Sequence, residues 1–295
     1  MKTQALISAI LLTVLARTAP AATYDVYPDG SGDAPTIQAA IDLAVSGDGI
    51  QVYSGTYYED DLLADGKDLV LINQGGLALV VSSVPGSGTG LTIRNVSEAF
   101  TMTGFEFRGY GKGVVIDSGS PTFWFSRLIE CGTGIEISGT GSAPQVMFCL
   151  VDSCGTGAAV NGAEGALVRN MTVVNCQTGI EVSAGSVTLS RNIVYGCDTG
   201  FYCTGGSASL GCNDLWLNTA DYTGCGPGTQ DISALPRFCF EAGGAPGPYY
   251  LHEDSPCWAE NNGCGYDMGA FTQLPGCTGT AVEQTTWGAI KRLHR

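Results

Sequence analysis

A four-residue step that begins with cysteine and ends with glycine recurs through the middle of the chain and limits the fold more than any other feature. Its clearest copies begin at Cys131, Cys154, Cys176 and Cys197. They are 23, 22 and 21 residues apart, and related steps at Tyr110 and Asn218 extend the series by 21 residues at each end. A period of this length is typical of repeat architectures, in which each copy forms one structural unit.

An alternating strand follows each step, as in Gly134-Ile-Glu-Ile and Gly179-Ile-Glu-Val. Every second side chain of such a strand faces one side, so the apolar ones are predicted to fill a barrel interior. The predicted interior residues are Ile135, Ile137, Val160, Val173, Ile180, Val182 and Phe201. Short strands and glycine corners at this period, without helical periodicity, predict a parallel β-solenoid.

A column of asparagines lies five or six residues before the cysteine column. It consists of Asn170, Asn192 and Asn213, and earlier coils place Ser126 and Cys149 there. Asparagine tolerates a left-handed backbone, and its side chain can hydrogen-bond the main chain of the next coil. We therefore predict an asparagine ladder at one corner of the coil.

The ends of the chain and its repeats resemble the right-handed parallel β-helix proteins of the pectin-lyase-like superfamily. Residues 23–33, with Pro35-Thr-Ile-Gln-Ala-Ala-Ile and Gly55-Thr-Tyr, are similar to the opening segment of that family. Ser255-Pro-Cys and Asp267-Met-Gly-Ala-Phe are similar to the closing segment of many secreted bacterial members. The resemblance implies an all-β fold, a single right-handed parallel β-helix, but no particular activity.

Both ends of the barrel are predicted to be capped. Pro35 suits the first turn of a helix, and a short helix would place its apolar side chains on one face, where it can plug the N-terminal end. These side chains are Ile37, Ala40, Ile41 and Ala44. The irregular stretch from about residue 225 to 277, rich in glycine and proline, is predicted to cap the far end.

Three segments are predicted: a signal peptide at 1–22, the β-helix domain with its caps at 23–277, and a C-terminal tail at 278–295 that suggests sorting or anchoring. Lys2, the apolar run Ala5 to Ala16 and the small residues before position 23 support the first segment. The apolar run is too short to span a bilayer, which takes about 20 residues. We therefore expect a secreted or cell-surface monomer without a transmembrane segment.

Charge argues against a nucleic-acid partner. Removal of residues 1–22 leaves 11 basic against 28 acidic residues, a formal charge of −17. Nucleic-acid binding depends on neutralising phosphates with lysine and arginine. The same charge would repel acidic polysaccharides unless a cation bridges them.

The cysteines fall into two sets. The four in the repeat column lie within disulfide reach of their neighbours, so they form either pairwise bridges or buried free thiols, and we favour free thiols. Disulfides are expected in the looser C-terminal region, where cross-links limit the unfolded ensemble. Our first expectations are the pairs Cys212–Cys225 and Cys257–Cys264.

The residues that would identify a catalytic site are scarce. Histidine occurs only at His252 and His294, beyond the repeats, which disfavours a histidine-based triad or metal centre. The four motifs typical of the superfamily's polygalacturonate hydrolases are missing. We therefore assign no catalytic, cofactor-binding or metal-binding residue, and expect calcium only if the protein resembles the calcium-dependent lyases of the family.

Charged and aromatic side chains remain as candidates for a binding surface. Two carboxylates, Glu136 and Glu181, share a column two coils apart, which is too far to hold one ion. Other charged residues gather in the earlier coils or beside the asparagines: Glu106, Arg108, Lys112, Asp117, Arg127, Arg169 and Arg191. The aromatic candidates are Phe123, Trp124, Phe125, Tyr202, Trp216 and Tyr222, about half of which must face the core by strict alternation.

Three functions are compatible with these residues. The first is a non-catalytic β-helix that binds a polysaccharide or a cell-surface glycan through its lateral face. The second is a polysaccharide lyase or glycosidase of the same superfamily, and the third is a structural adhesin. The missing hydrolase motifs and the acidic charge favour the first function.

Overall fold

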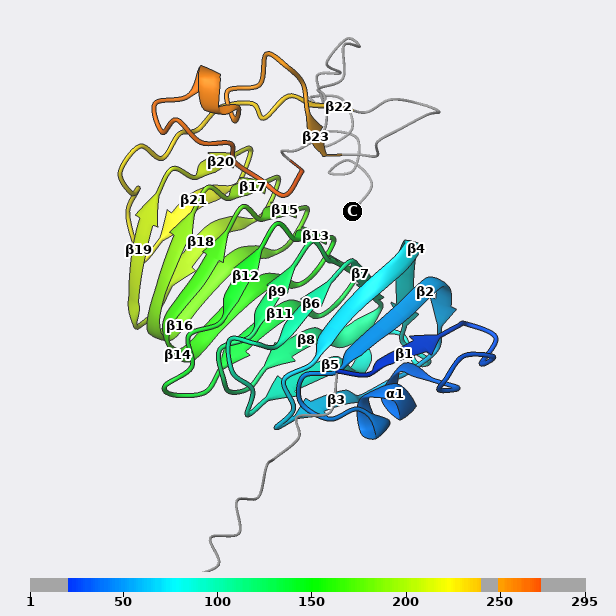
Figure 1. Cartoon of the computed structure of the whole chain (residues 1–295). Coiled ribbons are helices and arrows are strands. Elements are labelled where there is room, and N and C mark those ends of the chain that lie inside the picture. Colours follow the sequence, from blue (N-terminus) through cyan, green and yellow to red (C-terminus); the bar gives the residue numbers. More distant parts are fainter. Residues whose placement is uncertain (1–20, 240–248, 272–295) are drawn as a thin grey trace, which may run out of the picture.

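The computed structural model describes residues 21–239 and 249–271 and shows a parallel β-solenoid of about nine turns. The coils stack side by side along one axis (Figure 1). Helix makes up only 4% of the structure. The fold class predicted from the repeat is confirmed. Most of the predicted signal peptide, and the predicted tail at 278–295, lie outside the described residues.

Each full coil contributes strands to three lateral faces. The first face is formed by β3 (Leu62–Asp65), β5 (Ser87–Arg94), β8 (Tyr110–Ile116), β11 (Thr133–Ser138), the first halves of β14 (Thr156–Arg169) and β16 (Thr178–Ser190), β18 (Thr199–Cys203) and β21 (Ala220–Thr223). The second face is formed by β1 (Thr23–Val26), β2 (Gly49–Tyr57), β4 (Val70–Val81), β6 (Thr101–Thr103), β9 (Thr122–Trp124), β12 (Gln145–Met147), the second halves of β14 and β16, and β19 (Ser207–Gly211).

The third face is the one that the C-terminal segment partly covers. It continues from the ends of β2 and β4 through β7 (Phe105–Arg108), β10 (Arg127–Ile129), β13 (Leu150–Asp152), β15 (Thr172–Val174), β17 (Ile193–Tyr195) and β20 (Asp214–Trp216). Its strands are short because a residue in left-handed conformation bends the chain on each side of them. In the coil of β10 these residues are Phe125, with φ 47°, and Glu130, with φ 56°.

The glycine of the repeated step is required by the closeness of the coils. Gly134, Gly157 and Gly179 lie in successive coils, and a Cβ on Gly157 would come within 2.5 Å of the Gly179 carbonyl oxygen and 2.5 Å of Val173 Cγ1. A Cβ on Gly134 would likewise lie 2.6 Å from the Gly157 oxygen. Real Cβ atoms do not approach backbone oxygens this closely, so the step needs glycine where one coil stacks on the next.

The cysteines of the step point into the barrel as free thiols. Cys131, Cys154, Cys176 and Cys197 are all buried and unpaired. The Cys131 thiol donates to Ile129 O at 3.4 Å, and the backbone N–H of Cys131 donates to Cys154 Sγ at 3.4 Å. Burial, and the neighbouring thiol of Cys154 above all, raise the pKa of Cys131 far above its usual range. The favoured prediction of buried thiols is therefore confirmed, and all seven predicted interior residues are buried beside them.

The asparagine ladder exists, but the sequence prediction placed one member wrongly. Asn192 accepts from the Met171 N–H at 2.9 Å and donates to Val168 O, while Asn213 Oδ1 accepts from the Asn192 main chain at 3.0 Å. The equivalent residue one coil earlier is Met171, not Asn170. Asn170 instead occupies the left-handed position, with φ 50°, and its side chain donates to Asp267 O and Gly269 O.

The N-terminal end is closed as predicted. Helix α1 (Ile37–Leu43) buries Ile37, Ala40 and Ile41 against the first coil. Thr36 caps the helix by accepting from the Ala39 N–H, so Pro35 precedes the cap rather than forming the first turn. None of the described helices has the length and apolar character that a bilayer-spanning helix needs.

The C-terminal region does more than close the far end. Residues 225–236 continue the last coil through bridges to Gly211 and Asp214. The chain then folds back over the third face (Figure 1), and this return includes the antiparallel pair β22 (Phe238–Cys239) and β23 (Tyr250–Leu251) and the short 3-10 helix η1 (Ala259–Asn261). The return buries outer side chains of that face, among them Leu150, Val174, Ile193 and Tyr195. The region is therefore a cover for the third face as well as an end cap.

The disulfides of this region are not the two that the sequence suggested. Cys203–Cys225 joins the last coils and Cys212–Cys264 ties the cover to the solenoid, whereas Cys257 is a buried free thiol. The prediction paired cysteines that are near in sequence. Cys264 instead joins Cys212 across 52 residues because the segment returns over the corner of an earlier coil.

A buried carboxyl group lies between the cover and the third face. Asp214 on β20 is fully buried, its Oδ1 accepts from the Ala234 N–H at 3.0 Å, and the Cys257 thiol donates to its Oδ2 at 3.0 Å. Burial raises the pKa of Asp214 to about 7. The folded state therefore holds a proton that the unfolded chain releases near pH 4, an ordinary value for aspartate.

We expect the contribution of Asp214 to the free energy of unfolding to fall by about 3–4 kcal/mol as the pH rises from about 4 to about 7, and then to level off. The Asp214→Asn variant should lose this slope because an amide does not titrate. Urea unfolding at pH 4, 5.5, 7 and 8 measures both proteins. Parallel pH profiles for the two would contradict the assignment.

Candidate functional site

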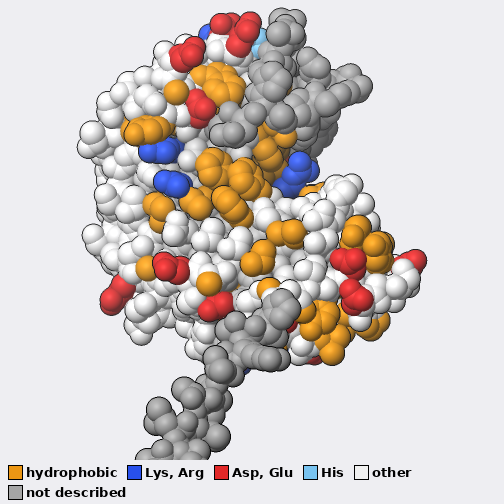
Figure 2. Space-filling view, viewed as in Figure 1, with side chains coloured by type: hydrophobic (Ala, Val, Ile, Leu, Met, Phe, Trp, Pro, Cys, Tyr) orange, Lys and Arg blue, Asp and Glu red, His pale blue; other side chains and the backbone are white. Residues whose placement is uncertain are grey.

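An open stretch of the third face lies between the C-terminal cover and the first coils. The cover buries the outer side chains of β13, β15 and β17, but Arg108 on β7 and Arg127 on β10 keep 41% and 36% of their side chains exposed. Strands β2 and β4 stand out beyond the following strands on the other side (Figure 1). The surface is hollowed between these two parts of the molecule (Figure 2). We call the exposed parts of β7 and β10, with the corner that precedes them, the open strip.

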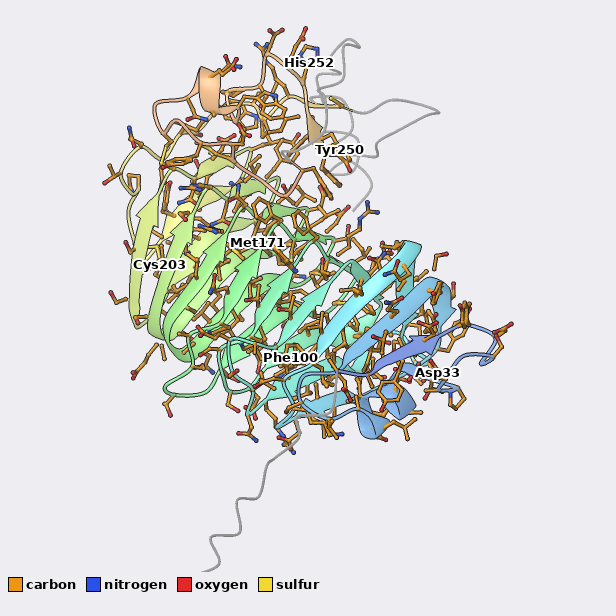
Figure 3. All side chains as sticks on the ribbon, viewed as in Figure 1. Asp33, Phe100, Met171, Cys203, Tyr250 and His252 are labelled. Carbon is orange, nitrogen blue, oxygen red and sulfur yellow. A yellow bond between two sulfur atoms is a disulfide. The ribbon has the colours of Figure 1, made fainter. Side chains whose placement is uncertain are left out.

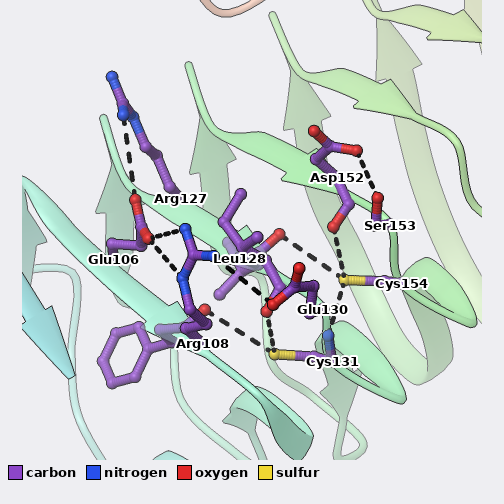
Figure 4. A network of polar contacts seen from close by, with 11 residues as sticks. Glu106, Arg108, Arg127, Leu128, Glu130, Cys131, Asp152, Ser153 and Cys154 are labelled. Atoms are coloured by element: carbon purple, nitrogen blue, oxygen red, sulfur yellow. Dashed lines mark hydrogen bonds and ion pairs between the residues drawn. The ribbon is translucent and has the colours of Figure 1, made fainter. Parts of the chain in front are cut away.

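Four charged residues on the open strip are linked in series by ion pairs (Figure 4). Arg108 donates to Glu106 Oε1 through Nε at 3.0 Å and through a terminal nitrogen at 2.7 Å, and its other terminal nitrogen lies 3.5 Å from Glu130. Arg127 lies 3.9 Å from the second oxygen of Glu106. Hydrogen bonding to Glu106, which is only 5% exposed, raises the pKa of Arg108. The network contains two carboxylates and two guanidinium groups, so its formal charges cancel.

An aromatic cluster forms the corner beside this network. The rings of Phe125 and Phe148 stack with their centroids 5.0 Å apart and their planes 12° from parallel, and Trp124 lies 5.3 Å from Phe125. Phe125 is 46% exposed. Both phenylalanines have left-handed backbones, with φ 47° and 54°. Bulky residues rarely adopt this conformation because it places Cβ against the carbonyl oxygen, at a cost of about 1–2 kcal/mol each.

The cover contributes a second aromatic pair. Tyr250 and Phe271 stack at 4.8 Å, and the Arg127 guanidinium lies 5.7 Å from the Phe271 ring. Figure 3 shows Tyr250 and His252 on the segment that lies over the third face. The open strip is thus bounded by aromatic rings at the corner and at the cover, with paired charges between them. Rings and fixed hydrogen-bonding groups of this kind suit a ligand with both apolar faces and polar edges.

The charged residues predicted to gather in the early coils do not form one cluster. Glu106, Arg108 and Arg127 come together on the third face. Lys112 instead pairs with Glu136 at 2.7 Å on the first face, and Asp117 accepts a hydrogen bond from Ser138. Lys112 lies on β8, a strand of the first face, and Asp117 follows directly after it, so neither side chain is on the face that carries the network. Glu181 is separated from Glu136 by Ala159, as predicted.

Arg169 and Arg191, which were predicted to stack in one column beside the asparagines, occupy different positions in their coils. Arg169 pairs with Ser190 in the strand ladder, whereas Arg191 lies at the left-handed corner position. The Arg191 guanidinium lies 3.6 Å from the centre of the Tyr266 ring, and its carbonyl accepts from the Gly269 N–H. Arg191 therefore braces the cover against the corner. Arg169 contacts Met147 through Nε at 3.2 Å.

The aromatic candidates lie in different environments. Phe123 is buried in the core, Tyr222 donates to Asp231 at 2.9 Å, and Trp216 packs against the cluster under the cover. Only Trp124 and Phe125 contribute to the open strip. Sequence reasoning missed the remaining members, which are Glu130, Phe148, Tyr250 and Phe271. Phe148 had a usable signal, because it follows Phe125 by 23 residues, the local repeat length.

His294 and Cys277 lie beyond the described residues. Within residues 21–239 and 249–271, no group of three or more histidine, cysteine, aspartate or glutamate side chains is placed to hold a metal ion.

The geometry defines the class of protein as a parallel β-solenoid with a partly covered lateral face. Residues 89–225 match the family model described as the right handed beta helix region. The central coils are accordingly similar to that family, and the fold of the described residues is a parallel β-solenoid. No curated protein matches the sequence.

One solved structure with a similar fold is that of pectate lyase Pel9A. It has 18% sequence identity to this chain and a TM-score of 0.49, and the alignment covers 73% of this chain and 77% of that chain. The pectin methylesterase from Aspergillus niger, in a penultimately deglycosylated form, has 14% identity and a TM-score of 0.48, with 92% and 97% covered. At such identities and TM-scores, these similarities assign neither activity nor site residues to this chain.

Proposed function

We propose that the protein is a secreted or cell-surface β-helix that binds polysaccharide on the open strip. The observation that carries this proposal is the left-handed aromatic corner. Phe125 and Phe148 occupy positions where asparagine or glycine would be less strained, and 46% of Phe125 remains exposed. Strain at a surface position is typical of residues kept for binding rather than for stability.

Sugar rings match such a surface. One face of a pyranose carries C–H groups that pack on an aromatic face, while its hydroxyl groups reach charged and amide groups at the edges. Arg108, Glu106 and Arg127 are held in place by one another, so they can meet a ligand without being ordered first.

The proposed location is outside the cell. We infer that residues 1–22 are a cleaved signal peptide, that 23–277 form the mature domain, and that 278–295 are a sorting or anchoring tail. The disulfides Cys203–Cys225 and Cys212–Cys264 support an oxidising compartment.

A polysaccharide lyase or glycoside hydrolase is the alternative. One observation favours it: the carboxylate of Glu106 and two arginines lie beside the aromatic corner. Incubation with the polysaccharides used for binding, followed by measurement of new reducing or unsaturated ends, distinguishes cleavage from retention alone.

The binding proposal predicts that stability and binding respond in opposite directions at the corner. In the double variant Phe125→Asn/Phe148→Asn, the left-handed positions receive a residue that tolerates them, so we expect unchanged or higher thermal stability. Retention on insoluble polysaccharides should fall at least tenfold, because the stacking surface is gone. Pull-down on a panel of plant, algal and bacterial polysaccharides measures retention, and calorimetry measures stability.

The half-buried Tyr202 on the first face serves as the matched control. Tyr202→Leu removes an aromatic ring far from the corner and should leave retention as in the natural protein. Failure of the natural protein to be retained on any member of the panel would refute the proposed function. Equal retention of the double variant would remove the open strip as its site.

A further inference from the structure

The outer side of the second face carries no carboxylate from β2 to β19. Eight strands pair there in one parallel register, and their outer side chains form two columns, one from Gly49 to Ser209 and the other from Gln51 to Gly211. None of these sixteen positions, two on each of eight strands, holds an aspartate or a glutamate, and only Arg169 is charged. We call this surface the acid-free face.

The acidic residues of the chain lie elsewhere. Ten of the 28 occur between Asp25 and Asp68, at the N-terminal end, where Asp25 on β1 lies just beyond the acid-free face. Glu136 and Glu181 are outer residues of the first face, and Glu106 belongs to the third. Hydrophobic and uncharged side chains lie over β6, β9 and β12, with acidic ones toward the margins (Figures 1 and 2). A ligand that approaches the acid-free face therefore has no carboxylate to desolvate.

Polar side chains of the acid-free face have no partner in the protein. Within residues 21–239 and 249–271, the hydroxyl groups of Thr101, Thr122 and Thr188 and the side-chain amide of Gln145 form no hydrogen bond. All four side chains are partly or fully exposed. The charged groups of the open strip, by contrast, are bonded to one another. A hydroxyl group or an amide both donates and accepts, so these groups match the hydroxyl groups of a sugar.

The acid-free face adjoins the aromatic corner of the open strip. Trp124 lies in the column that borders the corner, and its ring centroid is 5.3 Å from that of Phe125, which is 46% exposed. Met147 and Arg169 follow Trp124 in the same column, and Arg169 Nε contacts Met147 Sδ. The open strip and the acid-free face are therefore continuous around the corner, and a ligand packed on the corner reaches both.

The extent of the acid-free face suits a solid polymer better than a single soluble chain. Seven steps from coil to coil, each about 4.8 Å, make the two columns on the order of 30 Å long. A soluble chain resting on a sheet face is contacted on one side only, and its ordering costs conformational entropy. Chains packed in an insoluble array are already ordered, so they bind a long face without that cost.

Charge favours an uncharged polymer. The formal charge of −15 repels polyanions at long range. At the face itself, Arg169 is the single cation among the sixteen positions, two on each of eight strands, which is too little to neutralise a polymer that carries a carboxylate on every sugar. Threonine, serine and glutamine side chains instead offer hydrogen bonds without charge.

We infer that the acid-free face, together with the aromatic corner beside it, binds the surface of an insoluble, uncharged polysaccharide such as cellulose or chitin. This inference rests on the proposed function and names the ligand class. Hydroxyl groups of the polymer meet the unpaired groups of Thr101, Thr122, Gln145 and Thr188, and its C–H faces pack on Trp124 and Phe125.

Binding isotherms of the full chain on microcrystalline cellulose and on insoluble chitin test this inference. We expect saturable retention on at least one of the two polymers. Retention should persist at high salt, because ion pairs contribute little to it. An excess of soluble cello- or chito-oligosaccharide should release less than a tenth of the bound protein, since a single chain lacks the ordered surface.

A pair of carboxylates placed on the acid-free face should abolish this retention. In Thr122→Glu/Thr188→Glu the two substitutions lie three coils apart in one column. Each carboxylate would have to be desolvated against the polymer without a partner, so the partition constant should fall at least tenfold. Thr133→Glu/Thr199→Glu is the matched control, because it makes the same changes three coils apart on the first face. It should bind as the natural protein does, and thermal unfolding verifies that both variants are folded.

The possible results separate this inference from the proposed function. Undiminished retention of Thr122→Glu/Thr188→Glu overturns the inference but leaves binding by the open strip standing, and so does retention confined to acidic or soluble polysaccharides. Equal losses in both double variants would reflect total charge and overturn it as well. Absence of retention on every polysaccharide overturns both proposals. Loss in the second-face variant alone supports both.

Discussion

Gly157→Ala should lower the free energy of unfolding by about 3 kcal/mol, at the upper end of what overpacking costs. The added Cβ would lie 2.5 Å from the Gly179 carbonyl oxygen in the next coil and 2.5 Å from Val173 Cγ1. The oxygen belongs to the backbone ladder and cannot rotate away. Relief requires the two coils to separate, which weakens the strand pairing of β14 with β16 over its whole length.

Gly226→Ala provides the matched control. Gly226 has nothing within 4 Å of the position of an added Cβ, and it lies on the surface of the last partial coil. We expect that substitution to change the free energy of unfolding by less than about 0.5 kcal/mol. Urea unfolding followed by circular dichroism measures both variants. A similar small effect at Gly157 would show that the coils are farther apart than the structure places them.

Asn192→Ala should cost about 3 kcal/mol because it leaves buried backbone groups without partners. The Asn192 side chain is fully buried, accepts from the Met171 N–H at 2.9 Å, and donates to Val168 O at 3.1 Å. It also donates to Asn213 Oδ1 at 3.0 Å. Alanine satisfies none of these groups.

Asn161→Ala is the comparison for this second variant. Asn161 also lies in a coil of the repeat, but its side chain is exposed. Its loss should have little effect on the urea midpoint. If Asn192→Ala unfolds at the same urea concentration as Asn161→Ala, the corner ladder contributes nothing to stability, and the role assigned to it is wrong.

The repeat could be predicted from sequence because its causes are local. Each glycine of the step is demanded by the next coil, and each cysteine fills the same place in the barrel, so both recur at the repeat spacing. Asn170 was assigned to the ladder because it is an asparagine, although its spacing to the next cysteine differs by one residue from that of Asn192. Asn170 lies six residues before Cys176, whereas Asn192 lies five before Cys197, and that single residue moves it from the ladder to the left-handed corner.

The cover and the site could not be predicted in the same way. Asn170 bonds the carbonyl of Asp267, 97 residues later, and Thr172 accepts from the Ala270 N–H, 98 residues later. No repeat spacing relates these residues, so nothing in the coil pattern indicates their contact. The Cys212–Cys264 disulfide was missed for the same reason, because its cysteines are 52 residues apart. The Phe125 and Phe148 pair and the Cys203–Cys225 disulfide, which spans 22 residues, both obey the coil spacing and were within reach of sequence reasoning.

The return of the C-terminal segment over the third face also sets the order of assembly. The coils depend on their immediate neighbours and can form one after another as the chain emerges. Residues 249–271 pack on strands that lie about a hundred residues earlier in the chain, so they can pack only after those strands have formed. A chain that stops before the cover would leave Val174 and Ile193 without the residues that bury them, so truncated products would expose an apolar surface.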